Sequence, residues 1–174
     1  KSDLECQDST LVKKTEKYAI AVVADGHGSA SYFRSSRGSL FATEAAITAI
    51  EELLETILSD KSNMDDFCAS IDKHLIQLER SVIARWHERV EDDYSKNPFL
   101  DSEILKVDEK HKEKYLKGER IEAAYGSTLI AVACTDAFWF GIHIGDGKCI
   151  TCDYRGNFAE PIPWDEKCFL NVTT

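Results

Sequence analysis

Two long stripes of apolar residues constrain the fold of this 174-residue chain more than any other feature of its sequence. Apolar residues recur every three or four positions, which predicts one helix over about 38–58 and a second from near residue 62 to residue 90. Ser62 and Asp65 have the spacing of a capping box and mark the expected start of the second helix. Each helix has one apolar face, so each needs a flat apolar partner.

Strands before and after these helices can supply that partner. Tyr18–Ala24 is a nearly continuous apolar run, typical of a strand that is covered on both faces. Later the apolar residues alternate with polar ones, which predicts three strands over 127–134, 137–144 and 148–154 that form an antiparallel meander. The whole pattern predicts one α+β domain over residues 1–174, with helices layered on an antiparallel sheet.

A charged segment separates the second helix from the meander. Residues 91–122 are rich in acidic and basic side chains and contain an Asn97-Pro98 turn signal. We expect a surface excursion here, with a short helix around 101–117. His111 should be solvated within it, because nearly all its neighbours are charged.

Composition excludes several classes of protein. The formal net charge of −10 argues against a nucleic-acid partner, which requires clustered cations. No run of about 18 apolar residues is present, so we expect no membrane helix and no membrane partner. Six cysteines are too few for a disulfide scaffold, which favours buried or half-buried free thiols and a reducing, cytoplasmic location. These cysteines are Cys6, Cys68, Cys134, Cys149, Cys152 and Cys168.

The apolar run that ends at Ala24 is followed by DGHGSA, residues 25–30. The carboxylate of Asp25 and the carbonyl of Gly26 are oxygen ligands of the kind that Mg²⁺ and Mn²⁺ prefer. Glycines on both sides of His27 permit a sharp turn that brings a carbonyl close to an ion. The alternative is a tight turn in which Asp25 caps a helix and His27 lies on the surface, and the short motif alone does not decide between them.

Three further motifs accompany this one: CQDS at 6–9, AYGSTLIAVA at 124–133 and IGDGK at 144–148. In this order, with two long helices between the second motif and the third, the chain resembles the metal-dependent protein phosphatases of the type 2C family. The resemblance is closer to the bacterial branch and spans nearly the whole chain. It implies an antiparallel β-sandwich flanked by helices, in α-β-β-α layers, here truncated at the C-terminus.

The resemblance also implies a set of site residues. Asp25 matches the aspartate that bridges two divalent metals, and Gly26 matches the glycine whose carbonyl ligates one of them. Asp146 matches an aspartate that contributes to a third, weaker metal site. Asp8 matches a carboxylate that holds metal-bound water, and His27 matches a histidine proposed as general acid toward the leaving hydroxyl.

These roles describe a phosphoric monoester hydrolase. Two adjacent Mg²⁺ or Mn²⁺ ions lower the pKa of a bridging water, so that hydroxide forms at neutral pH and attacks phosphorus. A histidine can then protonate the departing serine or threonine oxygen. The implied substrate is a phosphoserine or phosphothreonine protein, and the negative charge of the chain is no obstacle because the cations supply the positive charge.

The sequence departs from the family pattern at three places. Gln7 stands where many members have an acid. The basic residue that grips substrate phosphate lies upstream of the first motif in the family, and here only Lys1 suggests itself. Two later aspartates of the family should follow the meander, and neither occurs before Thr174. We therefore expect a partial catalytic domain that is weak or inactive alone and belongs to an active phosphatase.

Two other functions compete with this one. A catalytically silent pseudophosphatase that binds a partner or ligand is favoured by Gln7 and the missing aspartates. Retention of Asp8, Asp25, His27 and Asp146 disfavours it, because a silent site has no need to keep them together. An unrelated α+β binding domain with a chance DGHG would leave the other motifs unexplained.

Overall fold

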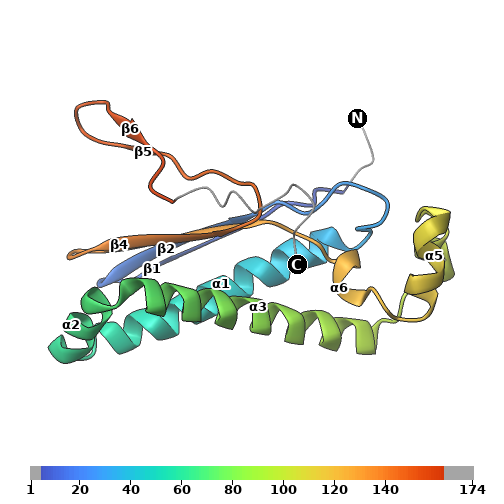
Figure 1. The fold of residues 1–174 in the computed structure, drawn as a ribbon, viewed down its shortest axis with the longest axis horizontal. Helices are drawn as coiled ribbons and strands as arrows, with labels where there is room; N and C mark the ends of the chain where they lie inside the picture. The colour runs from blue at the N-terminus through green and yellow to red at the C-terminus, as the bar shows by residue number, and fades with distance from the viewer. Residues whose placement is uncertain (1–4, 163–174) are drawn as a thin grey trace.

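The structure is a computed structural model that describes residues 5–162. A four-stranded antiparallel sheet carries two long helices on one face (Figure 1), which confirms the predicted α+β class. Its strands follow the order β1-β2-β3-β4 and span Ser9–Lys14, Tyr18–Ala24, Leu129–Thr135 and Trp139–Ile144. The predicted strand Tyr18–Ala24 is confirmed at both ends.

The helices follow the apolar stripes closely, with one break. They are α1 Ser35–Ile57, α2 Lys61–Ala69, α3 Ile71–Lys96, α4 Asp101–Ile104, α5 Glu109–Leu116 and α6 Ile121–Ala124. The single second helix that we predicted was wrong, because Ser70 leaves the helical region (φ −141°, ψ 42°) and separates α2 from α3. α2 begins at Lys61, next to the predicted start, but the predicted capping box was wrong: the Asp60 carboxylate accepts a hydrogen bond from the Ser62 N–H at 2.7 Å and caps the helix.

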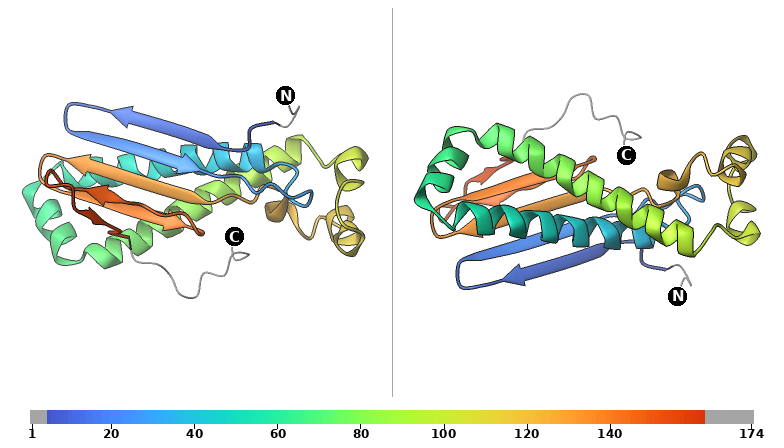
Figure 2. Two further views of the ribbon diagram at one scale, coloured as in Figure 1. Left: turned by 90° about the horizontal axis from the view of Figure 1, so that it is seen from above. Right: turned by 90° about the horizontal axis from the view of Figure 1, so that it is seen from below.

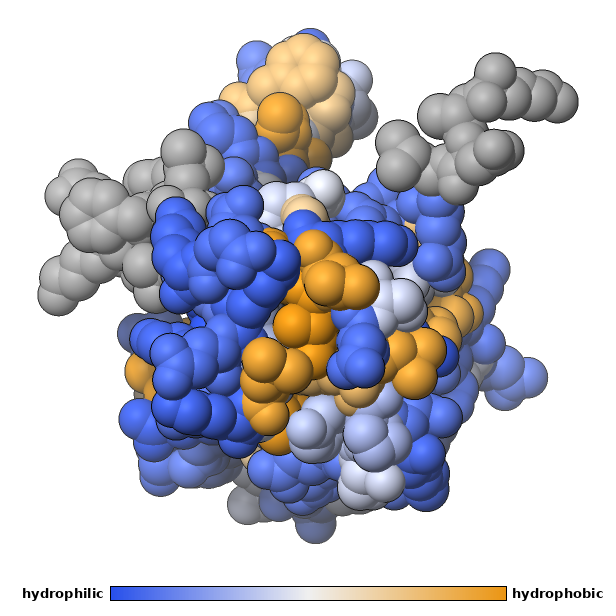
Figure 3. Space-filling model, turned by 90° about the vertical axis from the view of Figure 1, so that its right-hand side faces the viewer, coloured by the Kyte–Doolittle hydropathy of each residue, from blue (hydrophilic) through white to orange (hydrophobic). Residues whose placement is uncertain are grey.

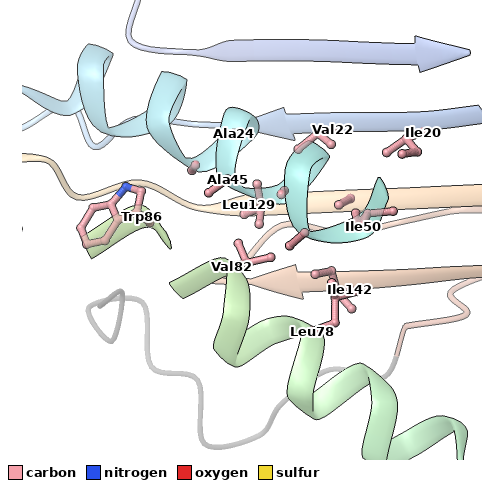
Figure 4. Packing of buried hydrophobic residues seen from close by; sticks show 14 of the residues in the cluster. Ile20, Val22, Ala24, Ala45, Ile50, Leu78, Val82, Trp86, Leu129 and Ile142 are labelled. Atoms are coloured by element: carbon pink, nitrogen blue, oxygen red, sulfur yellow. The ribbon is translucent and has the colours of Figure 1, made fainter. Parts of the chain in front are cut away.

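The core lies between the sheet and the pair α1 and α3, which run side by side beneath it (Figure 2). Alternate residues of β2, such as Ile20 and Val22, are buried and point toward these helices (Figure 4). On α1, Ala45 allows a close approach to the sheet, whereas Ile50 and Leu54 fill the space between its turns. Burying each large apolar side chain stabilises the fold by about 1.5–3 kcal/mol.

The other face of the four-stranded sheet is more exposed. Val23 of β2 and Val12 of β1 are exposed there, so coverage of both faces was wrong for this strand within residues 5–162. A short two-stranded ribbon, β5 Thr151–Cys152 with β6 Phe158–Ala159, lies on this side of the sheet (Figure 1). The second sheet of a sandwich stays a prediction.

The predicted meander is correct for two of its three strands. β3 and β4 pair as expected, but the expected third strand does not pair with β4. The chain instead turns away at Gly145, whose φ of 98° lies in the left-handed region that favours glycine. The fourth strand of the sheet is β1, which the sequence analysis missed and which pairs with β2.

The charged excursion is anchored to the fold rather than simply solvated. Ile104, Val107 and Tyr115 are buried, and His111 is half-buried, so its predicted solvation was wrong. The expected helix around 101–117 is present as two short helices, α4 and α5.

Cysteine exposure also differs from expectation. The five cysteines within residues 5–162 are free, but four are exposed and only Cys149 is half-buried, so burial of the thiols was wrong for most of them. Cys168 lies outside the described residues. Among the described helices, none combines the length and the apolar character that crossing a bilayer requires.

Candidate active site

Two carboxylates meet where β1 begins and β2 ends. Antiparallel pairing places Ser9 opposite Ala24, so the residues just outside this pair, Asp8 and Asp25, are neighbours. Their carboxyl groups lie within hydrogen-bonding reach of one another. The sheet register therefore brings together two acids from two separate sequence motifs.

A third acid joins them from the turn after β4. Asp146 lines the same open pocket of about 310 Å³ as Asp8 and Asp25, with Thr128 and Ile130 of the β3 segment forming part of the wall. Partial desolvation and the neighbouring carboxyl groups of Asp8 and Asp146 raise the pKa of Asp25. The pocket thus concentrates negative charge at one end of the sheet.

Backbone hydrogen bonds fix the turn that carries Asp25. The Thr128 N–H donates to the carbonyl of Asp25 at 2.8 Å, and the Asp25 N–H donates to Oγ1 of Thr128 at 3.2 Å. The His27 N–H donates to the carbonyl of Gly126 at 3.1 Å. The AYGST motif therefore holds both ends of the turn.

The CQDS motif holds the same turn from the other side. The Gly26 N–H donates to the carbonyl of Gln7 at 3.2 Å. A Cβ on Gly26 would lie 2.5 Å from that carbonyl oxygen and 2.8 Å from the carbonyl oxygen of Ser35, so only glycine fits. Close backbone packing explains this glycine better than an unusual dihedral angle does.

His27 lies at the edge of the acidic pocket. Its ring packs against Tyr32, with 4.6 Å between the centroids, and it is half-buried. Burial lowers the pKa of His27, while the charges of Asp25 and Asp146 oppose this by favouring the imidazolium. The imidazole of His27 therefore lies near the carboxylates of Asp25 and Asp146, where it can take up and release a proton.

The sequence model of the family described as Protein phosphatase 2C matches residues 1–174. The chain belongs to the protein phosphatase 2C family. No curated protein matches it. In the structure three of the four motifs, CQDS, DGHGSA and AYGSTLIAVA, pack around one turn.

Protein phosphatases 2C generally use Mg²⁺ or Mn²⁺, which are bound mainly by oxygen atoms. Within residues 5–162, no three side chains among histidine, cysteine, aspartate and glutamate form a closed metal site. The donors near the pocket are nevertheless of the right kind, because carboxylate and carbonyl oxygens suit hard cations that also keep several waters. The Asp25 carboxylate, whose pKa is raised by burial and by the neighbouring carboxyl groups, also gains most from a nearby cation.

This protein phosphatase 2C chain has a second polar cluster that sequence reasoning missed. Arg34, just before α1, is only 5% exposed. Its guanidinium donates two hydrogen bonds to the carboxylate of Glu103, both at 2.9 Å, and one to the hydroxyl of Tyr125 at 2.8 Å. The two remaining donors bond the carbonyls of Asn97 at 2.6 Å and Pro98 at 3.1 Å.

The Arg34 cluster is connected to the candidate active site through Tyr125. Burial raises the pKa of Tyr125 to about 12, so its hydroxyl stays protonated and donates to Asp93 at 2.6 Å. Tyr125 directly precedes Gly126, whose carbonyl accepts the bond from His27. The sequence contains one sign of this cluster: Arg34 directly precedes α1, where a positive charge is unfavourable next to the positive end of the helix dipole, so the arginine is expected to have partners elsewhere.

Proposed function

We propose that this chain acts as a metal-dependent serine/threonine protein phosphatase. One observation carries the proposal: Asp8, Asp25 and Asp146 gather in one pocket beside His27, in a chain of the protein phosphatase 2C family. Phosphorylated proteins are the proposed substrates.

The electrostatics of the pocket favour metal dependence. A phosphomonoester is an anion, and three carboxylates in a chain of net charge −10 would repel it. Cations must therefore offset this charge before the substrate can approach. Asp25, Asp146 and the carbonyl of Gly26 are the proposed metal ligands.

Bound Mg²⁺ or Mn²⁺ would lower the pKa of a coordinated water and neutralise charge on the phosphoryl oxygens. The chain contributes the remaining tasks. Asp8 would accept a hydrogen bond from the attacking water and orient it, because its carboxylate faces Asp25. His27 would donate a proton to the departing serine or threonine oxygen, and the nearby acids would stabilise its charged form.

A binding-only role is the second candidate. The observation that favours it is the lack of a closed set of metal-binding side chains within residues 5–162. Such a pseudophosphatase would retain the pocket and bind a partner there without turnover.

Phosphopeptide hydrolysis by the full-length protein separates the two. With Mn²⁺ we expect turnover of phosphoserine and phosphothreonine peptides, loss of turnover with a chelator, and at least a roughly hundredfold loss in Asp25→Asn. Asp136→Asn is the matched control, because Asp136 is an exposed aspartate in the turn between β3 and β4 and should leave turnover unchanged. Folded protein that binds Mn²⁺ without turnover would support the silent alternative.

A further inference from the structure

The segment from residue 106 to residue 120 is basic in an otherwise acidic chain. It holds six lysines and arginines against four aspartates and glutamates, whereas the chain as a whole has a formal net charge of −10. This segment includes α5 and leads toward α6. It lies at the same end of the molecule as the loop between β2 and α1 (Figures 1 and 2).

Aromatic contacts join α5 to the loop that carries His27. The Tyr115 hydroxyl donates to the carbonyl of Ser31 at 2.7 Å. The Tyr115 ring packs against Phe33, with 5.4 Å between the centroids. Tyr32, between these two loop residues, packs against His27. The basic segment therefore borders the candidate active site.

Arg120 is oriented by uncharged groups. One of its terminal nitrogens lies 3.0 Å from Nδ1 of His111, and its guanidinium lies 5.6 Å from the centroid of the Tyr115 ring. Because a guanidinium only donates, Nδ1 accepts this bond and carries no proton. Arg120 forms no ion pair with a carboxylate among the described residues, so its charge is not neutralised by a partner.

Two lysines of α5, Lys110 and Lys114, add to this positive charge. The nearby Lys112 and Lys117 do not, because they form ion pairs with Glu109 and Glu113. Lys110 and Lys114 are exposed and have no ion-pair partner within residues 5–162.

The electrostatics at His111 are consistent with this arrangement. Desolvation lowers the pKa of His111, and the charges of Arg120, Lys110 and Lys114 lower it further. Asp108 opposes this effect. Lys110 and Lys114 lie four positions apart on α5 and so share one face of the helix, and Arg120 contacts His111 of the same helix.

We propose that Arg120, Lys110 and Lys114, here called the α5 basic surface, bind acidic side chains that flank the phosphorylated residue of a protein substrate. The inference rests on the proposed phosphatase function, and it gives that function a substrate preference. A guanidinium that is already oriented can take a carboxylate in a two-pronged hydrogen bond at little further entropic cost.

The surroundings favour a peptide over a nucleic acid. Figure 3 shows this end of the molecule, where apolar side chains gather among hydrophilic ones. Leu105 and Leu116, beside and within α5, are exposed. Three cations in a chain of net charge −10 provide too little positive charge for a polyanion, whereas a few carboxylates on a peptide match them.

The test measures binding of two non-hydrolysable phosphoserine-analogue peptides to the full-length protein in Mn²⁺ at low salt. The peptides differ only in their flanking residues, which are aspartate in one and serine in the other. We expect the acidic peptide to bind about fivefold more tightly, and this ratio to fall toward one in Lys114→Glu and Arg120→Gln. Raising the salt concentration should also reduce the ratio, because the contacts are exposed.

Lys14→Glu is the matched control, since Lys14 is an exposed lysine at the far end of β1 and should leave the ratio unchanged. Equal affinity for both peptides, including no measurable binding of either, would overturn the inference, as would a ratio that survives in both α5-surface variants. Stronger binding of an unphosphorylated oligonucleotide than of the acidic peptide would also count against it. Failure of the phosphatase proposal would look different, because a preference for the acidic peptide would persist without turnover of hydrolysable peptides.

Discussion

Replacing Arg34 with methionine should unfold the domain at a much lower denaturant concentration. The guanidinium uses all five of its N–H donors, two of them on the carboxylate of Glu103. Methionine keeps most of the volume but leaves that carboxylate without its buried partner, a loss that costs about 3–5 kcal/mol. With a urea m-value of about 2.5 kcal/mol/M, the midpoint of unfolding should fall by roughly 1.5 M.

Arg37→Met supplies the comparison, because Arg37 is also an arginine at the start of α1 and pairs with Asp93 at 2.9 Å. Its side chain is 48% exposed, so the loss should stay below about 1 kcal/mol. Equilibrium urea unfolding followed by circular dichroism measures both variants. If Arg34→Met lowers the stability no more than Arg37→Met does, the Arg34 cluster does not hold the excursion in place, and the reasoning is wrong.

Two further predictions concern acid stability and the turn at the site. Burial raises the pKa of Asp93 and of Glu103, but hydrogen bonds from Tyr125 and Arg37 to the first and from Arg34 to the second lower it more, so both values end below the ordinary range. The stabilisation that these two carboxylates give the folded state is fully present above the unfolded carboxyl pKa of about 4 and is lost as the pH falls through their folded pKa values. The difference in free energy of unfolding between wild type and Glu103→Gln, measured by urea titration, should therefore narrow between pH 6 and pH 3. Gly26→Ala should lower the free energy of unfolding by about 1–3 kcal/mol and remove most of the turnover. Gly28→Ala is the control: its Cβ would meet nothing closer than 3.7 Å, so this variant should unfold at the wild-type temperature and keep its activity.

Long, strongly periodic elements were predictable from the sequence. β2 matches its expected bounds and α1 begins three residues before the expected start, because one apolar face repeats over many turns or steps. The break at Ser70 was not predictable from this signal, since the apolar stripe continues across it from Phe67 to Leu78. The period of an apolar pattern indicates which face of a helix or strand is buried, but it does not reveal a local change in backbone direction.

Short or edge strands gave weaker signals. β1 has only one neighbour in the sheet, carries two lysines, and has its two large apolar residues, Leu11 and Val12, side by side, so it lacks a period of two. The segment after Gly145 was predicted as the third strand of the meander, but its strand β5 pairs with β6 instead of β4. Which strand a segment pairs with depends on where the preceding turn directs the chain, and the alternation of apolar and polar residues does not encode this direction.

The site shows the same division between local and long-range information. The DGHG turn was found because a strand end and its glycines are adjacent in sequence, and Asp8 and Asp146 were placed by resemblance. The structure brings all three acids to one pocket. Arg34 could not be assigned a role, because its partners Glu103 and Tyr125 lie 69 and 91 positions away.

The hydrogen bond between Asp25 and Thr128 joins residues 103 positions apart, and this separation has a kinetic consequence. Closing so long a loop costs considerable chain entropy, so pairing of β2 with β3 should lag behind the α1–α3 hairpin during folding. The acidic pocket then assembles in one of the last steps, and a nascent chain that has emerged only through α3 presents helices without a functional centre.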